Sequence, residues 1–240
     1  MSETIIKRKL LKVLSELTEV TSALNRFGLK RHYWRDVLYQ VFYVIIVPVT
    51  YTVLYVVTNI SSGGAFSTSI PFLVFDIYIY FTVSLLNNHF VLLLLVIKTN
   101  FSAINNYLEN FGKPFVDKTH ALKVDTPKYH SVSEIKLMMF LYDKLCGSAS
   151  IVSFMYGGVF LLSTAINLGD LFVCLFYVEK KGTAISMLMI VSLLLIRAIR
   201  LFEEFRVYYT AQVTANEGHA TKRLVHKAIL KTQNKLLIKE

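Results

Sequence analysis

Four long apolar stretches are the feature that most constrains how this 240-residue chain folds. A helix needs about 20 consecutive apolar residues to cross the roughly 30 Å hydrocarbon core of a bilayer. Such stretches cover residues 37–58, 67–97, 146–178 and 182–202. They predict an all-α fold, a polytopic transmembrane helical bundle with four spans.

The composition excludes a soluble domain. Hydrophobic residues make up 54% of the chain and charged residues only 18%, whereas about a quarter of the residues of a soluble domain are charged. The net charge of +10 does not indicate nucleic-acid binding, because the basic residues flank apolar stretches. The last span is the weakest, since Arg197 and Arg200 follow early. It requires snorkelling side chains or a helix that continues outward.

Orientation follows from the loops that hold Lys and Arg, because cytoplasmic flanks carry the excess. Basic residues concentrate in 1–36, 98–137 and 203–240, while 59–66 has no charge and 179–182 is short. Both ends of this chain are therefore expected on the cytoplasmic side. Apolar residues recur at helical spacing in 10–24 and 135–145, which predicts cytoplasmic amphipathic helices that extend the spans. Thr126-Pro127 predicts a break in the middle loop.

Two acids inside apolar spans, Asp76 and Asp170, are the first candidate site residues, because a carboxylate in a span usually faces a cavity or a partner. Each lies about two turns from the outer end of its helix, which favours a polar, outward-opening cavity. Tyr78, Tyr80 and Asn167 are suited to line a pocket for an aromatic or sugar-like molecule. In the alternative interpretation, each carboxylate bonds a neighbouring helix and the aromatics face lipid or core.

The sequence contains no motif of an enzyme or a metal site. A metal-ligand cluster, a nucleophile elbow, a glycine-rich phosphate loop and a protease-like aspartate pair are all absent from it. Cys146 and Cys174, the two cysteines, lie some 40 Å apart if one helix carries both, so they do not form a disulfide within the chain. We expect no catalytic residue, no metal and no cofactor.

Three stretches carry a resemblance to insect gustatory receptors, seven-helix chemoreceptors with a cytoplasmic N-terminus. They are Leu14 to Leu24, Phe140 to Cys146 with Gly157 beyond it, and Ala215 to His226. They resemble the family's segment between helices two and three, its entry to helix five and its segment before helix seven. The positions that match the family's motifs are Asp143, Leu145, Cys146, Gly157, Glu217 and Thr221.

The resemblance covers nearly the whole chain, which would correspond to helices three to six. It implies a subunit of a ligand-gated cation channel in a plasma membrane, opened by a small-molecule tastant. A full-length subunit would form homo- or hetero-tetramers in the lipid bilayer. The family's seventh helix, which lines the ion pathway, has no counterpart here. We therefore expect a fragment, a partial gene model or a degenerate copy.

Two alternatives remain open at this point. The related odorant receptors share the inverted topology, although residues 215–226 favour the gustatory branch. A four-span membrane scaffold or transporter subunit, complete as it stands, belongs to another class. Paired cysteines in a large outer loop would indicate a scaffold, and repeat symmetry with interrupted helices a transporter. Neither sign is visible in the sequence.

Sequencing the full-length transcript at both ends tests the expected truncation. The receptor interpretation predicts two upstream spans and a downstream apolar helix with Thr-Tyr and a Gln. An in-frame stop directly after Glu240 would contradict a functional channel.

Overall fold

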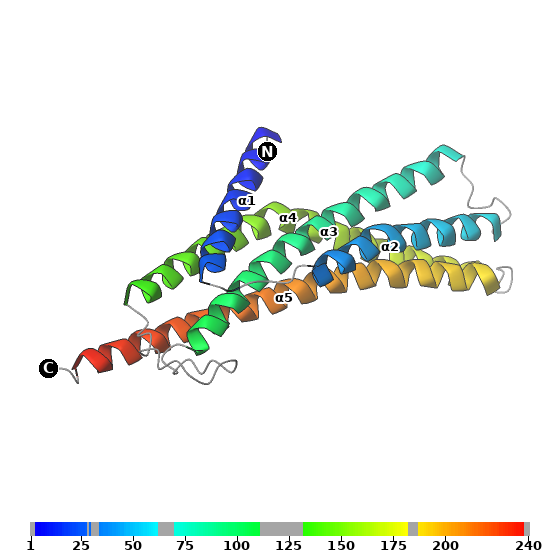
Figure 1. The fold of residues 1–240 in the computed structure, drawn as a ribbon. Coiled ribbons are helices and arrows are strands. Elements are labelled where there is room, and N and C mark those ends of the chain that lie inside the picture. The colour runs from blue at the N-terminus through cyan, green and yellow to red at the C-terminus, as the bar shows by residue number, and fades with distance from the viewer. Residues whose placement is uncertain are drawn as a thin grey trace. The chain divides into compact units, whose positions relative to one another are not determined.

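The computed structural model describes residues 3–27, 29, 34–61, 70–110, 132–181 and 187–237. Every regular element in these ranges is a helix, which confirms the predicted all-α fold. Figure 1 labels the helices α1 (Glu3–Arg26), α2 (Trp34–Ser61), α3 (Ile70–Glu109), α4 (Val132–Lys181) and α5 (Met187–Leu237). The predicted break at Thr126-Pro127 lies outside the described residues.

Three of these helices are long and apolar enough to cross a membrane. The qualifying stretches are Val37–Thr58 of α2, Val74–Glu109 of α3 and Ser133–Phe176 of α4. At about 1.5 Å per residue, α3 and α4 are both longer than a bilayer is thick. The described part of α5 does not qualify, because four charged residues follow its apolar start within 18 residues. The fourth span, residues 182–202, and the assignment of segments to the membrane or cytoplasm therefore stay predictions.

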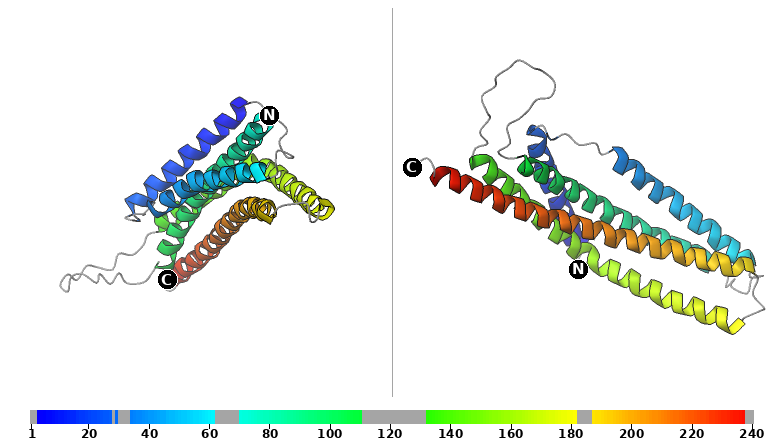
Figure 2. Two further views of the ribbon diagram at one scale, coloured as in Figure 1. Left: turned by 90° about the vertical axis from the view of Figure 1, so that its right-hand side faces the viewer. Right: turned by 90° about the horizontal axis from the view of Figure 1, so that it is seen from below.

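The chain divides into two compact units. Unit 1 comprises Met1–Lys30, Val96–Ile151 and Gln212–Glu240, and unit 2 comprises Arg31–Leu95 and Val152–Ala211. Helices α3, α4 and α5 contribute residues to both units, and Figures 1 and 2 show each of them as one uninterrupted helix.

Unit 1 is a helical bundle with an ordinary apolar core. Helix α1 is amphipathic, and its buried residues recur every three or four positions, at Val13, Leu17, Val20 and Leu24. The same unit buries Ile97 and Ile104 of α3, Met138, Leu141 and Leu145 of α4, and Val225 of α5.

Hydrogen bonds at the edges of this core join α1, α3 and α4 to one another. Ser148 of α4 donates to Glu16 of α1 over 2.7 Å, and Tyr107 of α3 donates to Glu134 of α4 over 2.8 Å. Thr21 of α1 bonds Asn100 of α3 over 3.4 Å. Unit 1 thus has an apolar core with polar contacts between its helices.

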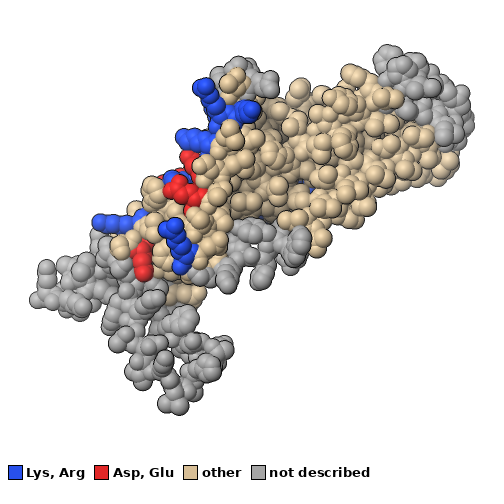
Figure 3. All heavy atoms as spheres, turned by 45° about the horizontal axis from the view of Figure 1, so that its top comes forward, with Lys and Arg blue, Asp and Glu red and all other residues tan. Residues whose placement is uncertain are grey.

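Unit 2 has the reverse distribution. Many large apolar side chains of α2 and α4 are exposed, among them Leu38, Ile45, Leu161 and Phe172. Its buried residues include many polar ones, which are Gln40, Thr58, Ser84, Asn87, Asn88, Ser163, Ser192, Glu203, Glu204, Arg206 and Thr210. On the face shown in Figure 3, unit 2 is almost entirely free of charged side chains. An extensive apolar exterior around a polar interior is suited to lipid rather than water.

Two adjacent methionines of α4 test the core of unit 1. Met138 is fully buried, whereas Met139 is 37% exposed. Replacing Met138 with alanine should lower the free energy of unfolding by about 2–5 kcal/mol, because it leaves a cavity. The same substitution at Met139 should cost much less. Thermal unfolding of the purified variants measures both, and equal losses would contradict this packing.

Candidate functional site

The first half of α5 carries five charged residues within a stretch dominated by apolar ones. They are Arg197, Arg200, Glu203, Glu204 and Arg206. Most are spaced by three or four residues, so they lie along one side of the helix. Glu203, Glu204 and Arg206 are buried, and both other arginines are largely so. Charges in such a place destabilise the fold unless they are paired.

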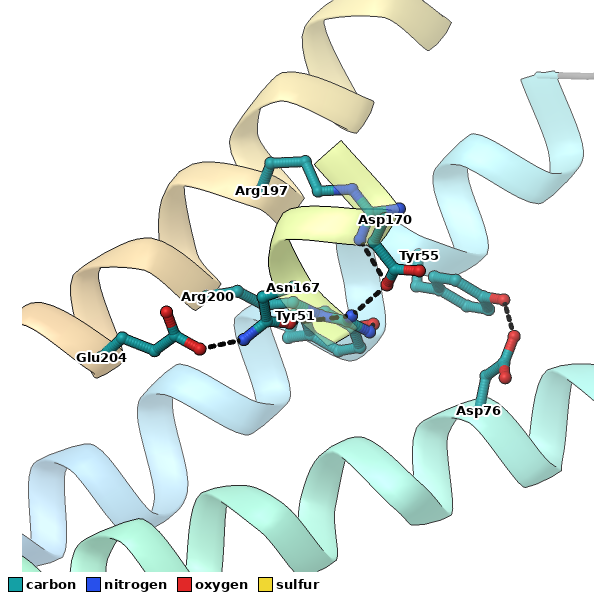
Figure 4. Close-up of polar contacts among 8 residues, drawn as sticks. All are labelled: Tyr51, Tyr55, Asp76, Asn167, Asp170, Arg197, Arg200 and Glu204. Atoms are coloured by element: carbon teal, nitrogen blue, oxygen red, sulfur yellow. Dashed lines mark hydrogen bonds and ion pairs between the residues drawn. The ribbon is translucent and has the colours of Figure 1, made fainter. Parts of the chain in front are cut away.

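Asp170 of α4 pairs with two of these arginines. The Nη1 atoms of Arg197 and Arg200 donate to its Oδ2 atom over 2.8 Å and 2.7 Å. The Nη2 atom of Arg200 also donates to the hydroxyl of Tyr51 on α2 over 2.5 Å. As Figure 4 shows, one guanidinium group therefore joins three helices of unit 2.

The remaining charges of α5 have partners on α2, α3 and α4. Glu203 accepts hydrogen bonds from Ser84 over 2.7 Å and from Tyr80 over 3.1 Å, both on α3. Glu204 accepts one from Asn167 of α4 over 2.5 Å. Arg206 donates to Asn88 of α3 and lies over the ring of Tyr43 of α2, 4.0 Å from its centroid.

This set of side chains is formally neutral. It contains three guanidinium groups, on Arg197, Arg200 and Arg206, and three carboxylates, on Asp170, Glu203 and Glu204. Because the charges balance and are hydrogen-bonded, unit 2 can keep them in its interior.

Stacked tyrosines connect the same region to α2 and α3. The rings of Tyr51 and Tyr80 lie with centroids 3.5 Å apart, and Ile196 belongs to the same core cluster. Tyr55 stacks on Tyr51 and donates to Asp76 of α3 over 2.5 Å. Asp76 is thus held by α2, away from the arginines (Figure 4).

A cavity of about 60 Å³ lies beside the charged residues of α5. Its lining comes from α3, α4 and α5 and comprises Ile79, Tyr80, Val83, Asn87, Ser163, Ile166, Asn167, Arg200, Glu203 and Glu204. A cavity of about 150 Å³ holds benzene, so this one accommodates only a molecule or a group of a few heavy atoms.

The polar groups around the cavity differ in how far they are already engaged. Arg200, Glu203 and Glu204 are held by the bonds given above. Asn87 and Ser163 are 6% and 8% exposed, and within the described ranges their side chains have no hydrogen-bond partner. These two neutral groups are therefore available to a bound molecule.

The structure separates the five side chains proposed from sequence as pocket residues. Tyr80 and Asn167 line the cavity. Tyr78 does not, and 66% of its surface is exposed on the outer side of α3. Asp76 and Asp170 are also absent from the lining. Each bonds a neighbouring helix, α2 and α5 respectively, as the alternative interpretation described.

Sequence reasoning missed the role of α5. It treated Arg197 and Arg200 as flanking residues that snorkel, yet both point to Asp170. It did not single out Glu203, Glu204, Asn87 or Ser163. The usable signal was the alternation of basic and acidic residues at spacings of three and four, which indicates a polar stripe along a helix.

The motif positions of the resemblance lie mostly in unit 1. Glu217 of α5 accepts a hydrogen bond from Asn105 of α3 over 2.8 Å, and the buried Thr221 donates to the backbone carbonyl of Glu217. Leu145 is fully buried, and both cysteines are free thiols. Of these residues, Glu217 joins two helices, because it bonds Asn105 across from α5 to α3.

A family model described as 7tm chemosensory receptor matches residues 5–238. The chain belongs to this family. Comparisons with curated proteins and with solved structures gave no match. The family consists of receptors and is not an enzyme family. With three helices able to cross a bilayer, this chemosensory receptor is a membrane protein.

The ion pair at Arg200 predicts a large loss of stability on substitution. Changing Arg200 to glutamine removes one of the two cations on Asp170 and the partner of Tyr51. The cost should be about 3 kcal/mol or more, because a buried group is left unpaired. Arg223→Gln, at an exposed position of the same helix, is the matched control and should cost under about 0.5 kcal/mol. Thermal denaturation of the receptor in lipid nanodiscs compares the two; similar melting temperatures would contradict the pairing.

Proposed function

We propose that this chemosensory receptor is a gustatory receptor, a subunit of a ligand-gated cation channel in a plasma membrane that a small-molecule tastant opens. The observation that carries the proposal is the cavity of unit 2, where the side chains of Asn87 and Ser163 are buried and have no hydrogen-bond partner among the described residues. The similarity of residues 215–226 to the gustatory branch supports the choice of branch.

The size of the cavity suggests how a ligand opens the channel. A volume of about 60 Å³ is too small for an aromatic or sugar-like molecule. Such a ligand binds only when α3, α4 or α5 move apart around it. A ligand shifts a conformational equilibrium by its difference in affinity for the two states. A tastant that fits only the wider state therefore favours that state.

Membrane placement and assembly are part of the same proposal. Both ends of this chain face the cytoplasm, in keeping with the basic residues of 1–36, 98–137 and 203–240. The most apolar part of α4 is only 11% buried within the chain. This leaves a large surface for lipid and for the other subunits of a homo- or hetero-tetramer.

Whole-cell current recording tests the function. The protein is expressed with the flanking segments that its transcript encodes, and cells receive water-soluble tastants and volatile odorants in parallel. We expect inward cation currents for tastants. Currents for volatile molecules alone would favour an odorant receptor of the same family, and a correctly inserted protein that never conducts would favour a scaffold or transporter subunit.

Substitution of the free polar groups tests the pocket. Asn87→Leu and Ser163→Ala each remove one hydrogen-bonding group from the cavity, so the half-maximal tastant concentration should rise by roughly 2- to 10-fold. Asn106→Leu makes the same chemical change at an exposed position of α3 and should leave the concentration unchanged. Equal responses of all three variants would contradict the pocket.

A further inference from the structure

Each charged side chain that lines the cavity of unit 2 is already hydrogen-bonded before a ligand arrives, although the Nε atom of Arg200 has no partner among the described residues. Arg200 is the one cationic side chain in the described lining, and Glu203 and Glu204 are the anionic ones. Hydroxyl and amide donors hold both carboxylates. The cation is held differently, because its counter-ion does not belong to the lining.

That counter-ion is Asp170. Its Oδ2 atom accepts from Arg200 over 2.7 Å and from Arg197 over 2.8 Å. Arg200 has further bonds to Tyr51 and, over 3.3 Å, to the Oδ1 atom of Asn167. The guanidinium group of Arg200 lines the cavity, and it forms an ion pair with a carboxylate that is not part of the lining.

We propose that Asp170 is a specificity-determining residue, which keeps the cavity electrically neutral and so selects uncharged, hydrogen-bonding ligands against carboxylates and other small anions. The inference rests on the proposed function of the cavity as the ligand site. Asp170 acts through Arg200 and is a positioning residue rather than a contact of the ligand.

Desolvation is the physical reason for this selection. An anion that enters a cavity of low polarity loses its hydration and needs a cation with free donors in return. Asp170 compensates part of the charge of Arg200 and occupies its Nη1 donor, and Glu203 and Glu204 repel an incoming anion. A neutral molecule meets the free groups of Asn87 and Ser163 without that cost.

Acetate and acetamide make a matched pair of probes, since they have nearly the same shape and differ in charge. Their binding to the purified protein in lipid nanodiscs is measured by calorimetry and by ligand-observed NMR. We expect the unsubstituted protein to bind acetamide more tightly than acetate. Asp170→Asn should bind acetate roughly 10- to 100-fold more tightly than the unsubstituted protein, because Arg200 then makes charge-assisted bonds to it.

Three variants show whether the gain arises at Arg200. Adding Arg200→Gln to Asp170→Asn should abolish the gain, and Asp170→Glu should retain the preference for acetamide. Asp76→Asn removes a carboxylate of α3 that bonds Tyr55 of α2 and lies outside the cavity lining, so it should give no gain. A gain that persists in the double variant, or that Asp76→Asn reproduces, would overturn the proposal.

Glu204→Gln provides a second test that leaves Asp170 intact and so does not depend on the folding of Asp170→Asn. The new amide still accepts the bond from Asn167, while one repelling charge disappears from the cavity. Acetate binding should tighten here too, and unchanged binding in every folded variant would overturn the proposal.

Channel recording separates this inference from the proposed function. If these variants bind acetate more tightly but no tastant opens the protein, the result supports the neutral cavity and refutes the channel. If tastants evoke currents but no variant binds acetate more tightly, the result refutes only the specificity role of Asp170.

Discussion

The ion pair between Arg200 and Asp170 is the interaction on which the interior of unit 2 depends. Helix α5 places five charged side chains in a bundle whose outer surface is apolar. Because unpaired charges there would destabilise the fold by several kcal/mol, the surrounding helices supply a carboxylate, hydroxyls and amides where they face α5. Asp170, Tyr51, Ser84 and Asn167 are these partners, and each charge fixes the position of a second helix.

Sequence patterns predicted the helices well and their contacts poorly. The run Val37–Thr58 contains no ionisable side chain other than tyrosine, so length and composition identify a helix suited to lipid. The three-and-four spacing of Leu17, Val20 and Leu24 likewise identifies the buried face of α1. The depth of Asp170 in its helix could be counted from the sequence. Its partners could not, because they depend on which faces of α4 and α5 meet.

The placement of Tyr78 and Tyr80 illustrates the same limit. Two residues apart, they lie on nearly opposite sides of α3. Tyr80 packs against Tyr51 and bonds Glu203, while Tyr78 faces outward. Because both are tyrosines close to Asp76 in the sequence, they were expected to line one shared pocket.

A double-mutant cycle on Asp170 and Arg200 tests the central claim most directly. The free energy of unfolding is measured in lipid nanodiscs for the unsubstituted protein, Asp170→Ala, Arg200→Ala and the double variant. The account predicts that the double variant is less destabilised than the sum of the single variants, with a coupling of about 1 kcal/mol or more. Additive losses, with no coupling, would show that the two side chains do not pair and would contradict the polar interior described for unit 2.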